Sequence, residues 1–261
     1  MRIPEKFREL KKRNEGALIA YICAGDPTAE GTKEYVTALV RGGADIIELG
    51  LPFSDPVADG PTIQAGIERA LAAGMTPDIY FKMVRSLKVH IPLVVMTYYN
   101  LIFKRGLERF VVDCSASGIS GIIVPDLPAE ESGELAGLCE KNDIDLIFLV
   151  APTTTESRMK QILTRGTGFI YLVARLGVTG ARSDIAGSTS ELIQRVKTNT
   201  PKAVGFGISN GRQAAEIISA GADGVIVGSA FVDIIASGND VPRRLEALAR
   251  ELKYGIKMAP E

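Results

Sequence analysis

The feature that most limits how this chain can fold is a repeated alternation along the sequence. Eight short runs of apolar and β-branched residues are separated by longer stretches with helical periodicity. This alternation is expected of strand–helix units that build a parallel sheet, whose strands are buried on both faces and therefore read as continuous apolar runs. Several intervening stretches open with Thr or Asn and close at Gly, which are helix start and stop signals. The predicted strands span residues 17–25, 44–52, 92–100, 121–126, 145–152, 169–177, 202–209 and 222–230.

The length of the chain fits one barrel built from these units. Its 261 residues match the roughly 250 that are typical of an eight-fold α/β barrel. No linker, low-complexity segment or shift in composition divides the chain. We therefore predict an α/β fold in which residues 1–261 form a single (β/α)8 TIM barrel domain.

Two predicted helices are additional to the eight strand–helix units of a minimal barrel. One is an N-terminal helix at residues 4–14, before the first strand, and the other is a C-terminal helix at residues 241–258, after the last. The connection over residues 62–89 should be split, because Gly74 and Pro77 interrupt its helical pattern.

Charge and hydropathy argue against nucleic acid and membranes as partners. The chain has 30 Lys and Arg residues and 31 Asp and Glu residues, so it has no net positive charge that would attract nucleic acid or an anionic membrane. A local phosphate site, however, needs no net charge. The N-terminal segment MRIPEKFRELKKRNEG has no apolar stretch of signal-peptide length, and no apolar run reaches the ~20 residues that span a bilayer. We expect a cytoplasmic location.

The cysteines and the single histidine exclude several kinds of site. Cys23, Cys114 and Cys139 are odd in number and lack C-x-x-C spacing, which is typical of reduced thiols. His90 is the only histidine, so a catalytic triad or a histidine-based zinc site has almost no residues to draw on. No metal site is expected, and acid–base chemistry is left to carboxylates.

One charged residue, Glu48, lies inside the otherwise apolar run ADIIELGLP. A carboxylate in a buried parallel strand loses hydration worth several kcal/mol unless it is paired or neutralised. Substrates of barrel enzymes bind at the carboxyl ends of the strands, and Glu48 lies late in the second predicted strand. Catalysis therefore explains this residue better than a structural carboxylate satisfied by backbone amides.

Further polar residues follow neighbouring strands. Asp55 and Asp59 lie in the loop after the second strand, where turn formation explains either residue and spacing does not choose between them. Tyr98, at the end of the third strand, is a candidate substrate contact. Asp126, at the end of the fourth, fits a structural cap and a site role equally well.

Glycines after the last two strands indicate a phosphate site. Gly205, Gly207 and Gly228 allow backbone amides to approach an anion, and a helix beginning near Ser229 would point its positive end at that anion. A tight turn explains each glycine alone equally well, but this is the usual phosphate position in barrels. The segment GFGISNG lacks the spacing of a dinucleotide fingerprint.

The segment ELGLPFSDPVADGPTIQ, with GDP before it and GVTGAR, GFGIS and GSA after it, resembles the tryptophan synthase alpha subunit family over essentially the whole chain. The resemblance implies a single eight-fold barrel that cleaves indole-3-glycerol phosphate by a retro-aldol reaction into indole and glyceraldehyde 3-phosphate. It also implies a beta-subunit partner that receives the indole through a tunnel and carries pyridoxal phosphate, while the alpha chain holds no cofactor.

The resemblance also implies roles for individual residues. The catalytic glutamate and aspartate fall on Glu48 and Asp59, and Asp55 falls in a surface loop associated with the partner. The loop that contains Thr179 is expected to close over the substrate. The implied substrate-binding residues are Ile63, Tyr171, Thr179 and Phe206, beside Tyr98, and the implied phosphate-binding residues are Gly180, Gly207, Gly228 and Ser229.

Three functions remain open. They are the lyase, another phosphosugar barrel enzyme such as an isomerase, and a non-catalytic barrel that activates a beta subunit. An isomerase would not need both Glu48 and Asp59 at this spacing, and a non-catalytic partner could have lost either. The presence of both carboxylates favours the lyase.

Overall fold

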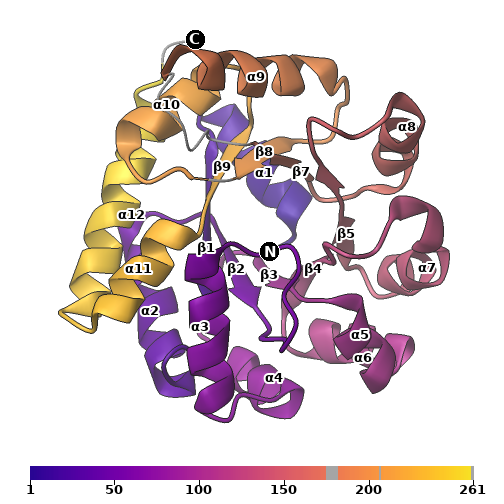
Figure 1. Cartoon of the computed structure of the whole chain (residues 1–261), viewed down its shortest axis with the longest axis vertical. Helices are drawn as coiled ribbons and strands as arrows, with labels where there is room; N and C mark the ends of the chain where they lie inside the picture. The colour runs from indigo at the N-terminus through magenta and orange to yellow at the C-terminus, as the bar shows by residue number, and fades with distance from the viewer. Residues whose placement is uncertain (175–181, 206, 260–261) are drawn as a thin grey trace.

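The computed structural model describes residues 1–174, 182–205 and 207–259, and in it the strands form a central barrel surrounded by helices (Figure 1). All strand pairs are parallel, in the order β5-β4-β3-β2-β1-β9-β8-β7-β6. The barrel prediction is confirmed. The strands are β1 (Ala17–Cys23), β2 (Ile46–Gly50), β3 (Leu93–Met96), β4 (Ile119–Ile123), β5 (Asp145–Ile147), β6 (Leu149–Val150), β7 (Ile170–Val173), β8 (Lys202–Gly205) and β9 (Gly224–Val227).

The described part of the chain contains nine strand segments, whereas the sequence predicts eight strands. The difference arises because the fifth predicted strand is interrupted at Phe148. The first part of this strand, β5, pairs with β4, and the second part, β6, pairs with β7. The carbonyl of Phe148 accepts a hydrogen bond from the backbone N–H of Tyr171 at 3.0 Å. The interrupted strand thus joins the two ends of the sheet and closes the barrel.

The helices follow the predicted signals. The side chains of Thr28, Thr76, Thr155 and Asn210 each accept a hydrogen bond from the first turn of a helix. The predicted split connection consists of two helices, α3 and α4. The helices are α1 (Ile3–Lys12), α2 (Ala29–Gly42), α3 (Pro61–Ala72), α4 (Pro77–Ser86), α5 (Tyr99–Arg105), α6 (Leu107–Ala116), α7 (Gly133–Lys141), α8 (Glu156–Arg165), α9 (Arg182–Arg195), α10 (Gly211–Ser219), α11 (Ser229–Ser237) and α12 (Val241–Lys257), with a 3₁₀ turn at Ala129–Glu131. None of the described helices is long and apolar enough to cross a membrane.

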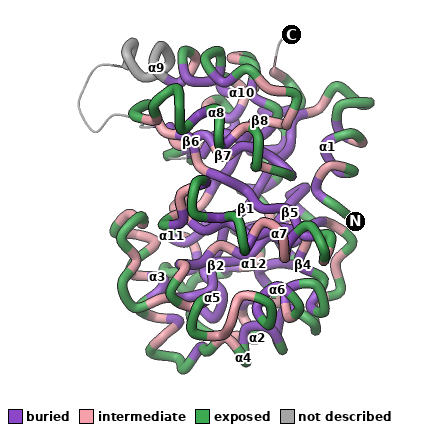
Figure 2. The backbone as a smooth tube through the Cα atoms, turned by 90° about the vertical axis from the view of Figure 1, so that its right-hand side faces the viewer, coloured by how far each residue is buried: buried purple, intermediate pink, exposed green. Residues whose placement is uncertain are grey.

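The N-terminal helix α1 fills one end of the barrel. Its apolar side chains, Ile3, Phe7 and Leu10, join the cluster that fills the barrel interior, and the ring of Phe7 lies 6.1 Å from that of Phe169. The strands are mostly buried, whereas the exposed residues lie on the helices and loops around them (Figure 2). Since side chains fill this end, the cavity that the described residues leave in the interior lies toward the carboxyl ends of the strands.

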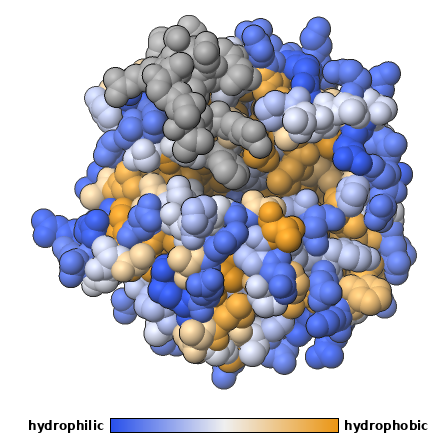
Figure 3. Space-filling model, in the orientation of Figure 1, coloured by the Kyte–Doolittle hydropathy of each residue, from blue (hydrophilic) through white to orange (hydrophobic). Residues whose placement is uncertain are grey.

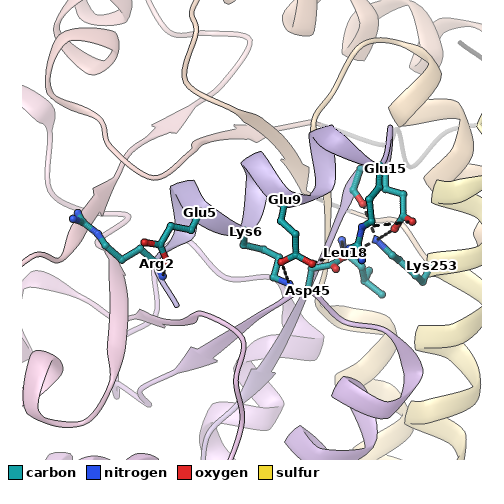
Figure 4. A network of polar contacts seen from close by, with 10 residues as sticks. Arg2, Glu5, Lys6, Glu9, Glu15, Leu18, Asp45 and Lys253 are labelled. Carbon is teal, nitrogen blue, oxygen red and sulfur yellow. Dashed lines mark hydrogen bonds and ion pairs between the residues drawn. The ribbon is translucent and has the colours of Figure 1, made fainter.

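A buried ion pair fastens the C-terminal helix to the same end of the barrel (Figure 4). The Nζ of Lys253, on α12, donates to Asp45 Oδ2 at 2.8 Å and to the carbonyl of Gly16 at 2.9 Å. Asp45 Oδ2 also accepts from the backbone N–H of Leu18 at 2.9 Å. Burial opposes ionisation of the nearby Glu15 carboxyl, but Lys253 and Lys257 hold its pKa below the usual value. The network ties α12 to the segments that enter β1 and β2.

Close backbone contacts set the position of α12 between α2 and α10. A Cβ on Gly255 would overlap the backbone of Gly211 on α10, and a Cβ on Gly42 would lie 2.6 Å from the carbonyl oxygen of Glu246. The helices can approach this closely only because these positions lack side chains.

We predict that Gly255→Ala lowers the free energy of unfolding by about 1–3 kcal/mol, because the new methyl group forces α10 and α12 apart. Gly137→Ala is the matched control, since Gly137 lies in helix α7 with open space around its Cβ position. The control should raise the free energy of unfolding by up to ~1 kcal/mol through helix propensity. The measurement is the urea midpoint of each variant, and equal midpoints would contradict the packing argument.

Candidate functional site

A cavity of about 300 Å³ lies at the open end of the barrel. Apolar surface gathers near the middle of this face of the molecule (Figure 3). Both carboxyl groups singled out in the sequence, Glu48 and Asp59, line the cavity. Its other lining residues are Tyr21, Ala58, Gly60, Pro61, Thr62, Ile63, Met96, Ile123, Pro125, Leu149, Tyr171, Val173, Gly207, Ile226, Gly228 and Ser229.

Glu48 is a buried carboxyl group with one oxygen unpaired in the described part of the chain. It is 1% exposed, and its Oε2 has no hydrogen-bond partner among the described residues. Burial, and then the charge of Asp59, raise the pKa of Glu48 to about 8. The group is therefore mostly protonated at neutral pH, which makes it available as both a proton donor and, after transfer, a proton acceptor.

Asp59 is held in place by a tyrosine. The hydroxyl of Tyr98 donates to Asp59 Oδ2 at 2.6 Å and accepts from the backbone N–H of Ala58 at 3.0 Å. Burial raises the pKa of Asp59, and the hydrogen bond from Tyr98 opposes this shift. Gln64, on α3, donates to the backbone carbonyl of Asp59 at 2.8 Å. These contacts fix the loop between β2 and α3 over the cavity.

The structure separates the two aspartates that turn chemistry leaves equivalent. Asp55 is exposed and accepts a hydrogen bond from the hydroxyl of Ser54 at 2.6 Å, while Asp59 faces the cavity. Asp126 has a structural contact, because its Oδ1 accepts from the backbone N–H of Tyr99 at the start of α5, at 2.9 Å.

Most of the other predicted site residues meet at this cavity. Ile63, Tyr171, Gly207, Gly228 and Ser229 line it. Tyr98 is 3% exposed and reaches the site through Asp59. The predictions for Thr179, Gly180 and Phe206 lie outside the described residues.

Tyr21 is the main cavity residue that sequence reasoning missed. It lies in β1 directly opposite Glu48 in the parallel register, so both side chains point into the barrel. The available signal was a polar-tipped aromatic residue in an apolar run. It was not decisive, because every residue of β1 is buried and nothing in that run distinguishes the inner face from the outer.

A buried ion pair supports the helix that covers the cavity. Asp26, fully buried after β1, accepts two hydrogen bonds from the guanidinium of Arg69, at 2.8 and 2.7 Å. Arg69 is on α3, whose first turn includes Ile63 and follows Asp59. This pair therefore anchors α3 behind the cavity.

A larger hollow of about 580 Å³ adjoins the cavity at Pro125, Leu149 and Val173. Its charged side chains include Arg158 and Glu130, which already pair with each other at 2.8 Å. The smaller cavity is the better candidate site, because its buried carboxyl group, Glu48, forms no ion pair with any described residue. Among the described residues no group of three or more His, Cys, Asp or Glu side chains is placed to hold a metal ion.

Comparisons with known proteins show which family the chain resembles. A family model described as tryptophan synthase alpha chain matches residues 7–258. The chain is 66% identical over 255 residues to the tryptophan synthase alpha chain of Methanosarcina acetivorans, covering 98% of this chain and 94% of that relative. It is 64% identical over 258 residues to that of Methanosarcina barkeri, covering 99% and 98%.

Solved structures show the same similarity. A chain of Mycobacterium tuberculosis tryptophan synthase matches with a TM-score of 0.90 and 39% identity, covering 98% of each chain. A chain of the Pyrococcus furiosus tryptophan synthase complex matches with a TM-score of 0.83 and 37% identity, covering 91% of this chain and 98% of that one. The barrel, the pair of carboxyl groups in its open end and these matches together place the chain in the tryptophan synthase alpha chain family.

Proposed function

We propose that this chain cleaves indole-3-glycerol phosphate into indole and glyceraldehyde 3-phosphate, with Glu48 and Asp59 as its catalytic residues. The observation that carries the proposal is the position of both carboxyl groups on one cavity, with Glu48 buried and its Oε2 unpaired among the described residues. Membership of the tryptophan synthase alpha chain family supports the reaction.

The chemistry requires a proton to be added in one place and removed in another. The bond between indole carbon 3 and the glycerol chain breaks when carbon 3 is protonated and the adjacent hydroxyl loses its proton, so that the chain leaves as an aldehyde. Glu48, whose pKa of about 8 keeps it protonated, gives its proton to carbon 3 and then accepts the hydroxyl proton. Asp59 stabilises the positive charge that develops on the indole nitrogen.

The phosphate group is assigned to the start of α11. Its N-cap is Gly228, and among the described residues no side chain caps this helix, so its first-turn amide groups are available to an anion. We assign Gly207, Gly228 and Ser229 to phosphate binding, together with Gly180. Ile63 and Phe206 are assigned to the indole pocket, Tyr98 and Tyr171 to substrate binding, and Thr179 to the loop that closes over the substrate.

We further propose that the chain works as one domain over residues 1–261, in the cytoplasm, and in complex with a tryptophan synthase beta subunit. The partner assignment is supported by the solved relative from Pyrococcus furiosus, which is a tryptophan synthase complex. A reducing compartment is consistent with three buried free cysteines, Cys23, Cys114 and Cys139. The alpha chain itself is proposed to need no cofactor, since pyridoxal phosphate belongs to the beta subunit.

We predict that Glu48→Gln reduces indole formation by at least 10³-fold, because the amide can neither donate nor accept the transferred proton. Binding of a phosphate-bearing ligand should stay within several-fold, since the phosphate site is on the opposite side of β1. Indole is measured with purified chain and indole-3-glycerol phosphate, with and without a beta subunit. Unchanged turnover in Glu48→Gln would refute the role of Glu48. If the wild-type chain activates the beta subunit but forms no indole, the chain is a non-catalytic subunit.

We predict that Asp59→Asn lowers kcat by at least 10²-fold, because a neutral amide stabilises the charged indole nitrogen poorly. The control is Asp55→Asn, four residues earlier in the same loop but exposed. This control should leave kcat of the isolated chain within several-fold. If Asp55→Asn lowered kcat more than Asp59→Asn, Asp55 and not Asp59 would be the catalytic aspartate.

The protonation of Glu48 predicts a pH-dependent stability. Its pKa is about 8 in the folded chain and ~4.3 when unfolded, so between these values only the folded state holds the proton. This group therefore lowers the free energy of unfolding by about 1.4 kcal/mol per unit as pH rises from 5 to 7. The Glu48→Gln variant has no titrating group at this position and does not lose this stability. The free energy of unfolding of the variant minus that of wild type should therefore increase from pH 5 to pH 7. Urea unfolding of both proteins at each pH tests this, and a constant difference would contradict it.

A further inference from the structure

Tyr21 occupies the part of the cavity wall between the two ends of the proposed substrate. Its strand, β1, lies between β9, which leads into Gly228 and Ser229, and β2, which contains Glu48. In the parallel register Tyr21 is directly opposite Glu48 on one side. On the other side, an ideal Cβ on Gly228 would lie 3.2 Å from the Tyr21 ring. A molecule with its phosphate at Gly228 and its scissile bond at Glu48 therefore passes along Tyr21.

Packing, and not a hydrogen bond, holds the Tyr21 hydroxyl in place. The hydroxyl lies over Gly50, the residue two positions after Glu48 on the inner face of β2, and a Cβ at Gly50 would overlap it. Tyr21 is 5% exposed and lines the cavity, yet its hydroxyl makes no hydrogen bond to any described residue. A hydroxyl on a cavity wall that has no partner among the described residues can be satisfied by water or by a ligand in the cavity.

We propose that the Tyr21 hydroxyl donates a hydrogen bond to a hydroxyl of the substrate's three-carbon chain, and so selects a hydroxylated chain over an alkyl chain. The inference rests on the proposed function, because that function sets the two ends of the substrate. It adds a second contact to the three-carbon chain beside that of Glu48, whereas Asp59 and the phosphate site contact the two ends of the substrate.

The electrostatics suit a donor at this position. Burial, and then the nearby groups of Cys23, Asp59 and Glu48, raise the pKa of Tyr21 well above its ordinary value. The phenol therefore keeps its proton at any pH at which the barrel works. Tyr171 also lines the cavity, but it lies on β7, separated from β1 by β8 and β9. Its hydroxyl is thus not between Gly228 and Glu48.

The test compares two ligands in wild type and in Tyr21→Phe, each in complex with the beta subunit. The first ligand is indole-3-glycerol phosphate, and the second is 3-(indol-3-yl)propyl phosphate, which lacks both chain hydroxyls. We expect Tyr21→Phe to lower kcat/KM for the first about tenfold, and to leave the inhibition constant of the second within twofold. The alkyl ligand offers no group that the Tyr21 hydroxyl would bind.

The control is Tyr35→Phe, which removes a hydroxyl from α2, outside the cavity. It should change neither constant by more than twofold. The inference is overturned if Tyr21→Phe leaves kcat/KM within twofold, or if it weakens the alkyl ligand as much as the substrate, since that result indicates only a change in cavity shape. A wild type that forms no indole would instead refute the proposed function, and with it this inference.

Discussion

The closed parallel sheet brings the carboxyl ends of all its strands to one opening, and the rest of the molecule depends on this constraint. Inner side chains come from alternate residues of each strand, so the interior consists of layers. Helix α1 completes the layer at one end through Phe7 and its neighbours. At the other end the layer that includes Glu48 stays incomplete, and the cavity is the space that remains.

Buried charges are treated differently at the two ends. At the filled end Asp45 is paired with Lys253, and behind the cavity Asp26 is paired with Arg69. Those pairs join helices to the barrel. Among the residues that the structure describes, Glu48 has no cationic partner, and burial instead favours the neutral acid. The protein thus keeps one carboxyl group in a state that costs stability at neutral pH, a cost common at functional sites.

Pairs of tyrosine and glycine on adjacent strands shape the cavity. Tyr21 on β1 lies over Gly50 on β2, and Tyr171 on β7 lies over Gly205 on β8. Each large side chain fits because its neighbour has none. Gly205, which the sequence suggests for phosphate binding, is therefore explained by Tyr171, whereas Gly207 and Gly228 line the cavity.

The sequence by itself determined the barrel and its additional helices and singled out Glu48 as a candidate site residue, because apolar periodicity, cap residues and the cost of burying a charge are local properties. It predicted one continuous fifth strand, and the interruption at Phe148 arises from pairing with β4 and β7, which are distant in the chain. Turn chemistry left Asp55 and Asp59 equivalent, the family resemblance chose Asp59, and the structure places Asp59 on the cavity. Only the tertiary structure decided that Asp126 caps α5 and that Tyr21 points inward beside Glu48. The physical reason is the same in each case. A side chain's burial and direction depend on strand register and loop packing, and these are set by contacts between segments far apart in sequence.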